Sequence, residues 1–366
     1  MDSLRFVRSC LRTPVALIEL ENLVMIDIDF PTLQGIGFKQ HFVSQLAALP
    51  PGRRLARVTA VQRDWMSVSD GNDTFGARHL RHSASVVVGD WVLVTASGGE
   101  HWIDTVLEPV NRLTRRTPSG RQALASNVDT ALLLMGLDKD FNPRRMERYI
   151  ALVRACEVAP VMVLTKQDIG ADVADKMAQL RQRIPADVPI LALHPAEQDD
   201  GGMLAPWLGA GQTLVLLGSS GVGKSTLTNA LTGSAQATGG TRHGDDHGRH
   251  TTTACSLHRC PGGACIIDTP GLRAWQPDAD EEALELSFED IAALAGRCQF
   301  RDCGHESEPG CAVRGAIDAD RLRNYRKLLR ESRRAEQTPL ERIAARGKWK
   351  VLMKEAKQRG RDKRGG

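Results

Sequence analysis

The middle of the chain alternates short, uninterrupted apolar runs with segments of helical spacing. The apolar runs that read as buried strands cover residues 128–137, 161–165, 190–193, 213–217 and 266–268. The clearest helical segments between them are residues 144–156 and 224–231. Strands that are apolar on both faces and separated by helices are typical of a mainly parallel sheet with helices on both sides. The pattern therefore predicts an α/β domain, which we bound at residues 114–274.

The N-terminal part of the chain has shorter apolar runs separated by turn residues. Residues 58–68, 86–94 and 103–107 are expected to be strands, with turns at Asp70-Gly71 and Gly89-Asp90. This pattern favours a small all-β barrel over residues 46–113, and an OB-like barrel is the expected form. Residues 1–45 form a leader without a recognisable pattern. The polar residues 114–126 are expected to be a linker.

Composition excludes several classes of protein. The chain has 366 residues, of which 42% are hydrophobic and 25% charged, as in ordinary globular proteins of two or three domains. No apolar run approaches the roughly 20 residues that cross a bilayer, so no membrane association is expected. The N-terminus has arginines but no apolar segment followed by a cleavage site, so it does not read as a secretory signal. We therefore expect a cytoplasmic protein.

Positive charge is concentrated at the C-terminal end. Residues 321–366 hold 17 Lys and Arg against 5 Asp and Glu, whereas the whole chain has a net charge of only +4. Such asymmetry points to a basic arm that binds a polyanion. The alternative is a helix over residues 321–334 that is simply a solvated surface.

A glycine-rich sequence follows the apolar run at 213–217 and opens a helix, which is the context that a phosphate-binding loop requires. Its glycines let the backbone wrap tightly, so that successive amides point at phosphate oxygens. Lys224 is expected to reach the β- and γ-phosphates, and Ser225 to offer its hydroxyl to Mg²⁺. The residues predicted to bind nucleotide here are Gly218, Ser219, Ser220, Gly221, Val222, Gly223, Lys224, Ser225 and Thr226.

A second element indicates which base is bound. Thr165-Lys166-Gln167-Asp168 ends an apolar run and resembles the guanine-specificity element of GTPases. In that element an Asp, here Asp168, accepts hydrogen bonds from the ring N–H and the exocyclic amine of guanine, and adenine has no such donor pair. Lys166 would lie along the base plane. GTPases usually carry Asn where this chain has Thr165, so one amide contact is missing.

The metal-side and switch elements of a GTPase are also present. Asp268-Thr-Pro-Gly271 resembles the element whose Asp holds Mg²⁺ through water and whose Gly amide contacts the γ-phosphate. Thr252 lies between this element and the phosphate loop, where a threonine that closes over Mg²⁺ is needed. The predicted magnesium residues are therefore Ser225, Thr252 and Asp268. Since ordinary GTPases place the base reader last and this chain places it first, the domain is expected to be circularly permuted.

Three cysteines and one histidine lie close together after the switch element. Cys298, Cys303, His305 and Cys311 provide a complete tetrahedral ligand set for one Zn²⁺, with no position left for water. Eight cysteines are too few for a disulfide scaffold in a chain of this length, so metal is expected in preference to disulfides. A closed site of this kind is structural and not catalytic.

Together these features resemble the bacterial ribosome small-subunit-dependent GTPase A family over about residues 46–326. The resemblance rests on the permuted order, on the sequences DFNPRR at 140–145 and GRHTTT at 248–253, and on the cysteine cluster with Glu308-Pro-Gly310. It implies an OB barrel, a permuted GTPase domain at 114–274, a zinc-binding helical domain at 275–334 and a basic tail at 335–366.

The resemblance also implies a role. Such a protein assists the late maturation of the small (30S) ribosomal subunit, and the subunit stimulates its hydrolysis of GTP to GDP and phosphate. The barrel and the tail would bind 16S ribosomal RNA, and the protein would act as a monomer. Trp65, Trp91 and Trp102 are expected in the barrel core, with stacking on bases as the alternative.

The catalytic group has to differ from that of ordinary GTPases. They place a water-orienting Gln just after the second switch glycine, where this chain has the apolar Leu272. The resemblance implies that His250 orients the water, with Lys224 and Thr252 as the other catalytic residues. A second metal site that includes His243 and His247 is the alternative use of this histidine.

Two other functions remain open at this stage. One is a P-loop ATPase unrelated to ribosomes, which a comparison of GTP and ATP binding would distinguish. The other is a noncatalytic zinc-stabilised RNA-binding protein whose nucleotide only sets its conformation. Turnover measured with and without 30S subunits would separate that protein from a GTPase.

Overall fold

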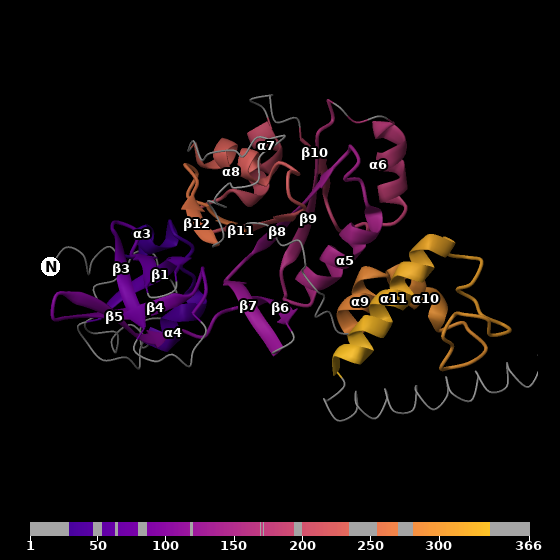
Figure 1. Cartoon of the computed structure of the whole chain (residues 1–366), viewed down its shortest axis with the longest axis horizontal. Coiled ribbons are helices and arrows are strands. Elements are labelled where there is room, and N and C mark those ends of the chain that lie inside the picture. The colour runs from indigo at the N-terminus through magenta and orange to yellow at the C-terminus, as the bar shows by residue number, and fades with distance from the viewer. Residues whose placement is uncertain are drawn as a thin grey trace, which may run out of the picture. The chain divides into compact units, whose positions relative to one another are not determined.

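The computed structural model describes residues 29–46, 53–62, 65–79, 86–117, 120–168, 170, 172–193, 200–233, 255–269 and 281–336. The expectations for the first 28 residues, for His250 and Thr252, for Gly271 and for the tail after residue 336 lie outside this part of the chain. The chain forms two compact units, one within residues 1–146 and 156–276 and the other within residues 147–155 and 277–366 (Figure 1).

The first unit contains the predicted, mainly parallel sheet. Its strands follow the order β10-β9-β8-β11-β13-β12, and every neighbouring pair is parallel except the antiparallel pair β12–β13. The strands are β8 (Thr130–Gly136), β9 (Ala159–Thr165), β10 (Ile190–Ala192), β11 (Thr213–Gly218), β12 (Ser256–Arg259) and β13 (Cys265–Asp268). All seven residues of β8 and all six of β11 are buried, which explains their uninterrupted apolar sequences.

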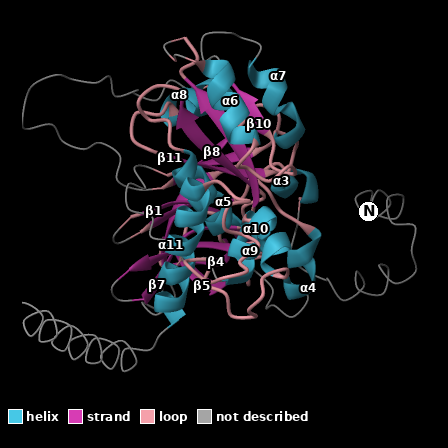
Figure 2. Cartoon of the chain, turned by 90° about the vertical axis from the view of Figure 1, so that its right-hand side faces the viewer, coloured by secondary structure: helices cyan, strands magenta, loops and turns pink. Residues whose placement is uncertain are grey.

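Helices lie on both sides of this sheet, and Figure 1 shows α8 and α6 on opposite sides of β8 to β10. The helices of the first unit are α6 (Val173–Arg181), α7 (Asp200–Leu204), η2 (Ala205–Trp207) and α8 (Lys224–Thr232), and α5 (Pro143–Arg154) begins in this unit. Leu231 of α8 belongs to the same buried cluster as Leu132 and Leu216 of the strands, and Leu227 packs against this cluster. Figure 2 shows the same helices from the side.

The N-terminal strands close into a five-stranded barrel. Strand β1 pairs with both β2 and β4, and β3 pairs in parallel with β5. The strands are β1 (Arg54–Val61), β2 (Met66–Ser69), β3 (Thr74–His79), β4 (Trp91–Ser97) and β5 (Glu100–Val106). The interior is lined by Ala56, Val58, Val68, Ala77, Val92, Val94 and Ile103. Through β1 and β12 the barrel and the parallel sheet share one hydrogen-bonded sheet.

The single strand expected at 58–68 is wrong. Gln62 N–H donates to the Trp65 carbonyl over 3.0 Å, which turns the chain back and makes β1 and β2 a hairpin. The apolar run hid this turn because only residues 62–64 interrupt it. The strand expected at 86–94 likewise begins only at Trp91. Gly89, at φ +96°, turns the chain before it, where an added Cβ would lie 2.2 Å from the Ser126 carbonyl oxygen.

The linker expected at 114–126 is also wrong. Residues 112–126 form an antiparallel hairpin of β6 (Arg112–Thr117) and β7 (Gly120–Ser126). Arginine and threonine hold five of the six positions of β6, and β7 begins with Gly-Arg-Gln, so no apolar alternation signals the strands. The hairpin is held together by backbone hydrogen bonds between β6 and β7, and its strands do not show the apolar sequence of a strand that is buried on both faces.

Part of the leader is ordered against the barrel. Residues 30–46 form α3 (Phe30–Gln34), η1 (Gln40–Phe42) and α4 (Val43–Leu46). Phe38 packs edge-on against Trp91, with 5.0 Å between ring centroids, and Phe42 is fully buried beside them. Trp91 is therefore a core residue as expected, whereas Trp65 is 41% exposed.

A fully buried arginine joins these parts of the first unit. Arg57 of β1 donates to the carbonyl oxygens of Ile36, Gly89 and Asn127 and to Thr213 Oγ1, over 2.6 to 3.3 Å. Its guanidinium therefore satisfies acceptors from the leader, the barrel, the entry to β8 and the start of β11.

The second unit is a small helical body. Its helices are α9 (Glu281–Ser287), α10 (Glu289–Ala295) and α11 (Ala319–Glu336), together with the larger part of α5. Buried Arg321 of α11 donates to Glu147 of α5 over 2.8 Å and makes a bidentate contact with Asp290 of α10 at 2.7 and 2.8 Å. Asn324 also donates to Glu147. Among the described helices, none is long and apolar enough to cross a bilayer.

Candidate functional site

The glycine-rich loop lies between β11 and α8, as predicted. Gly221 and Gly223 have φ values of +75° and +105°, which side chains with a Cβ adopt rarely. Lys224, the first residue of α8, is buried and donates from Nζ to the Gly218 and Ser219 carbonyl oxygens over 2.9 and 2.7 Å. The Lys224 side chain thus points back into the loop that precedes α8, which is the position needed to meet phosphate oxygens.

The base-reading loop lies at the same edge of the sheet. Strands β9 and β11 are both parallel to β8, which lies between them, so Thr165 and Gly218 end their strands at the same carboxyl-terminal edge, where α/β sheets bind ligands. Thr165 Oγ1 donates to the Val222 carbonyl oxygen over 2.8 Å, and both groups are buried. The base-reading loop and the phosphate loop are therefore in direct contact through Thr165. Asp168 is exposed, as a residue that meets a ligand would be.

Two aspartates that the sequence did not single out contact these loops. Asp138 forms an ion pair with Lys166 at 2.9 Å, and Asp140 accepts a hydrogen bond from Ser219 Oγ over 2.8 Å. Burial acts to raise the pKa of Asp138, but the hydrogen bonds from Lys166 and the Asp140 amide outweigh it and hold that pKa below its usual value. The sequence DFNPRR at 140–145, which carries part of the family resemblance, is the local signal that marks this loop.

Asp268 lies at the same carboxyl-terminal edge of the sheet as the two loops, on the side of β11 that is opposite to β8. It ends β13, which pairs in parallel with β11 so that Asp268 lies opposite Leu216. Burial raises the pKa of Asp268, and the charges of Lys224 and His258 partly offset this rise. A divalent cation beside this carboxylate would favour its charged form. Of the predicted magnesium residues, Ser225 and Asp268 lie in the described part of the chain.

The four predicted zinc ligands come together in the second unit. Their donor atoms all lie within 4.8 Å of one another. His305 Nδ1 is 3.7 Å from Cys298 Sγ and 3.5 Å from Cys311 Sγ. These distances agree with a tetrahedral zinc site, which places its ligand atoms roughly 3.5–3.8 Å apart. Burial lowers the pKa of His305, which favours the neutral imidazole that binds metal. The residues therefore fit a four-coordinate zinc ion.

A carboxylate shapes the loop that carries these ligands. Glu308 accepts hydrogen bonds from the backbone amides of Gly304, Glu306 and Ser307 over 2.7 to 3.0 Å. His305 lies within this segment at φ +57°, a conformation that residues other than glycine seldom adopt. The backbone turn around His305 is thus fixed by Glu308, which orients the imidazole toward the cysteines.

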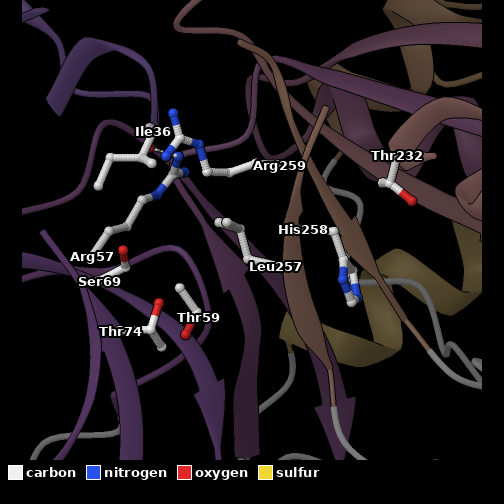
Figure 3. A pocket seen from close by; sticks show the side chains of 9 residues that line it. All are labelled: Ile36, Arg57, Thr59, Ser69, Thr74, Thr232, Leu257, His258 and Arg259. Carbon is white, nitrogen blue, oxygen red and sulfur yellow. Dashed lines mark hydrogen bonds between the residues drawn. The ribbon is translucent and has the colours of Figure 1, made fainter. Parts of the chain in front are cut away.

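A cavity of about 370 Å³ lies away from the nucleotide loops, between the barrel and β12. Figure 3 shows Arg57 of β1 and Arg259 of β12 with their guanidinium groups close to Ile36, above the hydroxyls of Ser69 and Thr59. None of the residues predicted to bind nucleotide or metal lines it. The cavity is a polar gap beside the Arg57 junction and is separate from the predicted site.

Comparisons with known proteins agree with this geometry. A family model described as RsgA GTPase matches residues 106–278. The chain is 40% identical over 350 residues to the small ribosomal subunit biogenesis GTPase RsgA of Xanthomonas oryzae pv. oryzae (strain PXO99A), covering 87% of this chain and 93% of that protein. It is 43% identical over 267 residues to the protein of the same name from Xanthomonas campestris pv. campestris (strain B100), covering 70% and 72%.

Solved structures show the same fold. YjeQ from Thermotoga maritima aligns with a TM-score of 0.58 at 24% identity, covering 77% of this chain and 99% of that one. YloQ, described as a circularly permuted GTPase, aligns with a TM-score of 0.55 at 24% identity, covering 78% and 97%. The permuted arrangement expected from the order of the motifs is therefore confirmed.

Proposed function

The chain belongs to the RsgA GTPase family and is a GTP hydrolase, and we propose that it hydrolyses GTP on the small ribosomal subunit during the late maturation of that subunit. The observation that carries the proposal is the contact of Thr165 with Val222, because it joins a guanine-reading loop to a phosphate loop at one sheet edge. Relatives that cover most of this chain are named small ribosomal subunit biogenesis GTPases.

In this proposal each nucleotide residue has a defined role. The amides of residues 218–226 surround the phosphates, and Lys224 moves its Nζ from the loop carbonyls to the β- and γ-phosphates. Asp168 accepts both guanine donors, while the stem of Lys166 and the Gln167 backbone line the base. Ser225, Thr252 and Asp268 would hold Mg²⁺, and the bound metal would supply charge neutralisation at the γ-phosphate. His250 orients the attacking water.

The barrel and the second unit are proposed to bind ribosomal RNA. The order of the barrel strands, with β1 closing on β4 and β3 parallel to β5, supports an OB barrel, a fold that binds oligonucleotides through its face and loops. In the second unit the exposed Arg314, Arg323 and Arg330 would contact phosphates of 16S ribosomal RNA, while one zinc ion would fix the loop beside them.

We infer that the domains cover residues 46–113, 114–274 and 275–334. We also infer that the protein is a monomer and works in the cytoplasm.

The proposal is tested by GTP turnover with and without purified 30S subunits, measured for the wild type, His250→Ala and the matched control His247→Ala. We expect 30S subunits to stimulate the wild type and His247→Ala alike. His250→Ala should lose stimulated turnover by on the order of 100-fold, with nearly unchanged GTP affinity. Full stimulated turnover in His250→Ala would show that another group orients the water. No stimulation of the wild type would remove the ribosomal role.

A further inference from the structure

One short loop contacts both halves of the proposed nucleotide site. Residues 137–142 connect β8 with α5, and this loop carries Asp138 and Asp140. Asp138 reaches the base-reading loop through Lys166, and Asp140 reaches the phosphate loop through Ser219. The two residues are also joined, because the Asp140 backbone amide donates to Asp138 Oδ1 over 3.0 Å.

The Asp140 carboxylate is anchored on both of its oxygens. Oδ1 accepts from Ser219 Oγ at 2.8 Å, and Oδ2 accepts from the Gly136 amide at 3.2 Å and from Arg145 Nη2 at 2.8 Å. Arg145 also donates to the Asp140 carbonyl oxygen over 2.6 Å. A carboxylate close to a phosphate loop is repelled by phosphate unless a cation compensates it, and Arg145 is that cation. The arrangement therefore fixes an acceptor for Ser219 at little electrostatic cost to a bound anion.

The contact with Ser219 matters because Ser219 is the second residue of the phosphate loop. Its side chain is tied to Asp140, so its backbone is held while its neighbours wrap around phosphate oxygens. Asp138 acts in the same way on Lys166, whose φ of +60° is otherwise unfavourable for a side chain with a Cβ. An ion pair at the Lys166 ammonium directs the lysine stem, which is the part that faces the base.

We propose that Asp138 and Asp140 are positioning residues for bound GTP, which fix the position of the base-reading loop relative to the phosphate loop. This inference rests on the proposed function, because it presumes that GTP occupies these two loops. Neither aspartate touches the nucleotide in this scheme. Asp140 acts through Ser219, and Asp138 acts through Lys166.

A double-mutant cycle tests the Asp140 contact directly. GTP and GDP affinities are measured for Asp140→Ala, Ser219→Ala and the double variant, by competition with a fluorescent GDP analogue. Since both single variants break the same hydrogen bond to a charged group, each should weaken GTP about tenfold. The double variant should also be weaker by about tenfold and not by about a hundredfold. The same cycle with Asp138→Ala and Lys166→Met tests the other branch, since Met keeps the lysine stem without its charge.

A control separates positioning from simple loss of stability. Asp129 precedes β8 at the opposite end, where it pairs with Lys39 and accepts from the Thr213 amide over 2.9 Å. Asp129→Ala removes a similarly buried carboxylate, and its GTP affinity should stay within about twofold of the wild type. Urea unfolding of every variant gives the stability change independently.

The outcomes are distinct. A wild type that does not bind GTP contradicts the proposed function. A wild type that binds GTP, with additive losses in both cycles or with losses in Asp129→Ala as large as those in Asp140→Ala, contradicts only the positioning role. Non-additive losses confined to the two cycles support it.

Discussion

Thr165 occupies a position at which GTPases usually carry asparagine, and the structure shows what the shorter side chain does. Its hydroxyl donates to the Val222 carbonyl oxygen in a buried setting, so the link between the two loops is present without an amide. The sequence suggested a lost contact because it could not show how closely β9 and the phosphate loop approach. A hydroxyl is sufficient at this separation.

Thr165→Val should weaken GTP and GDP binding, since valine has the same shape and no donor. The Val222 carbonyl oxygen would lose its partner, which costs about 1–3 kcal/mol for a buried group and corresponds to roughly five- to 150-fold in affinity if it acts on binding. Thr165→Ser keeps the hydroxyl and is the matched control. Calorimetric titration of both variants with GDP checks this, and equal affinities for Val and Ser would contradict it.

At the scale of elements, β1 is held to four other segments by one guanidinium. Burial lowers the pKa of Arg57, yet an arginine remains charged at neutral pH. Four protein acceptors compensate for that buried charge, and the Trp91 ring lies 5.7 Å from the Arg57 guanidinium carbon. Lysine could not replace it, because an ammonium lacks the planar fork that reaches acceptors in several directions.

Arg57→Met should lower the free energy of unfolding by about 3 kcal/mol, because it leaves buried carbonyl groups without donors. Arg53→Met is a suitable control. Arg53 is partly exposed and pairs with Asp104 at 3.3 Å, so its loss should cost under about 1 kcal/mol. Urea unfolding followed by circular dichroism measures both. Similar midpoints for the two variants would show that the Arg57 junction adds no stability.

The elements that sequence patterns predicted are those buried on both faces. In runs such as Leu132 to Leu134 the side chains on both faces of the strand are apolar and buried, so the sequence indicates a central strand that is covered on both sides. The hairpin of β6 and β7 has no such signal, because its strands carry arginine and threonine. The helices at 30–46 were missed for another reason. They are too short for a helical period, and the burial of Phe38 and Phe42 depends on Trp91 of the barrel.

At the scale of the whole molecule, the sequence predicts the binding motifs but not the residues that hold those motifs in place. The phosphate loop and the cysteine cluster have fixed spacings that follow from phosphate and zinc geometry. Asp138, Asp140 and Glu147 act on partners far along the chain, such as Ser219 and Arg321, and no local pattern reveals such pairs. The division into two compact units, with α5 contributing to the second, likewise depends on tertiary contacts.

Removal of zinc should affect the second unit and spare the first. Under a strong chelator, or in Cys303→Ala, the segment at 296–317 should become sensitive to protease, because it contains no helix or long strand to hold it. GTP affinity should stay within about twofold, since the described nucleotide residues all belong to the first unit. Metal analysis and limited proteolysis check this. Folded, protease-resistant protein without metal, or parallel loss of GTP binding, would contradict it.

The strand order also determines what a growing chain can do. Synthesis completes β8, β9 and β10 before β11, although β11 belongs beside β8 in the finished sheet. At about 5–20 residues per second, the edge of β8 stays unpaired for a second or more after β10 has emerged. An unpaired apolar strand edge takes up other strands readily. Nascent chains of this protein therefore pass through a stage at which they are prone to mispairing, and this stage ends only when β11 inserts.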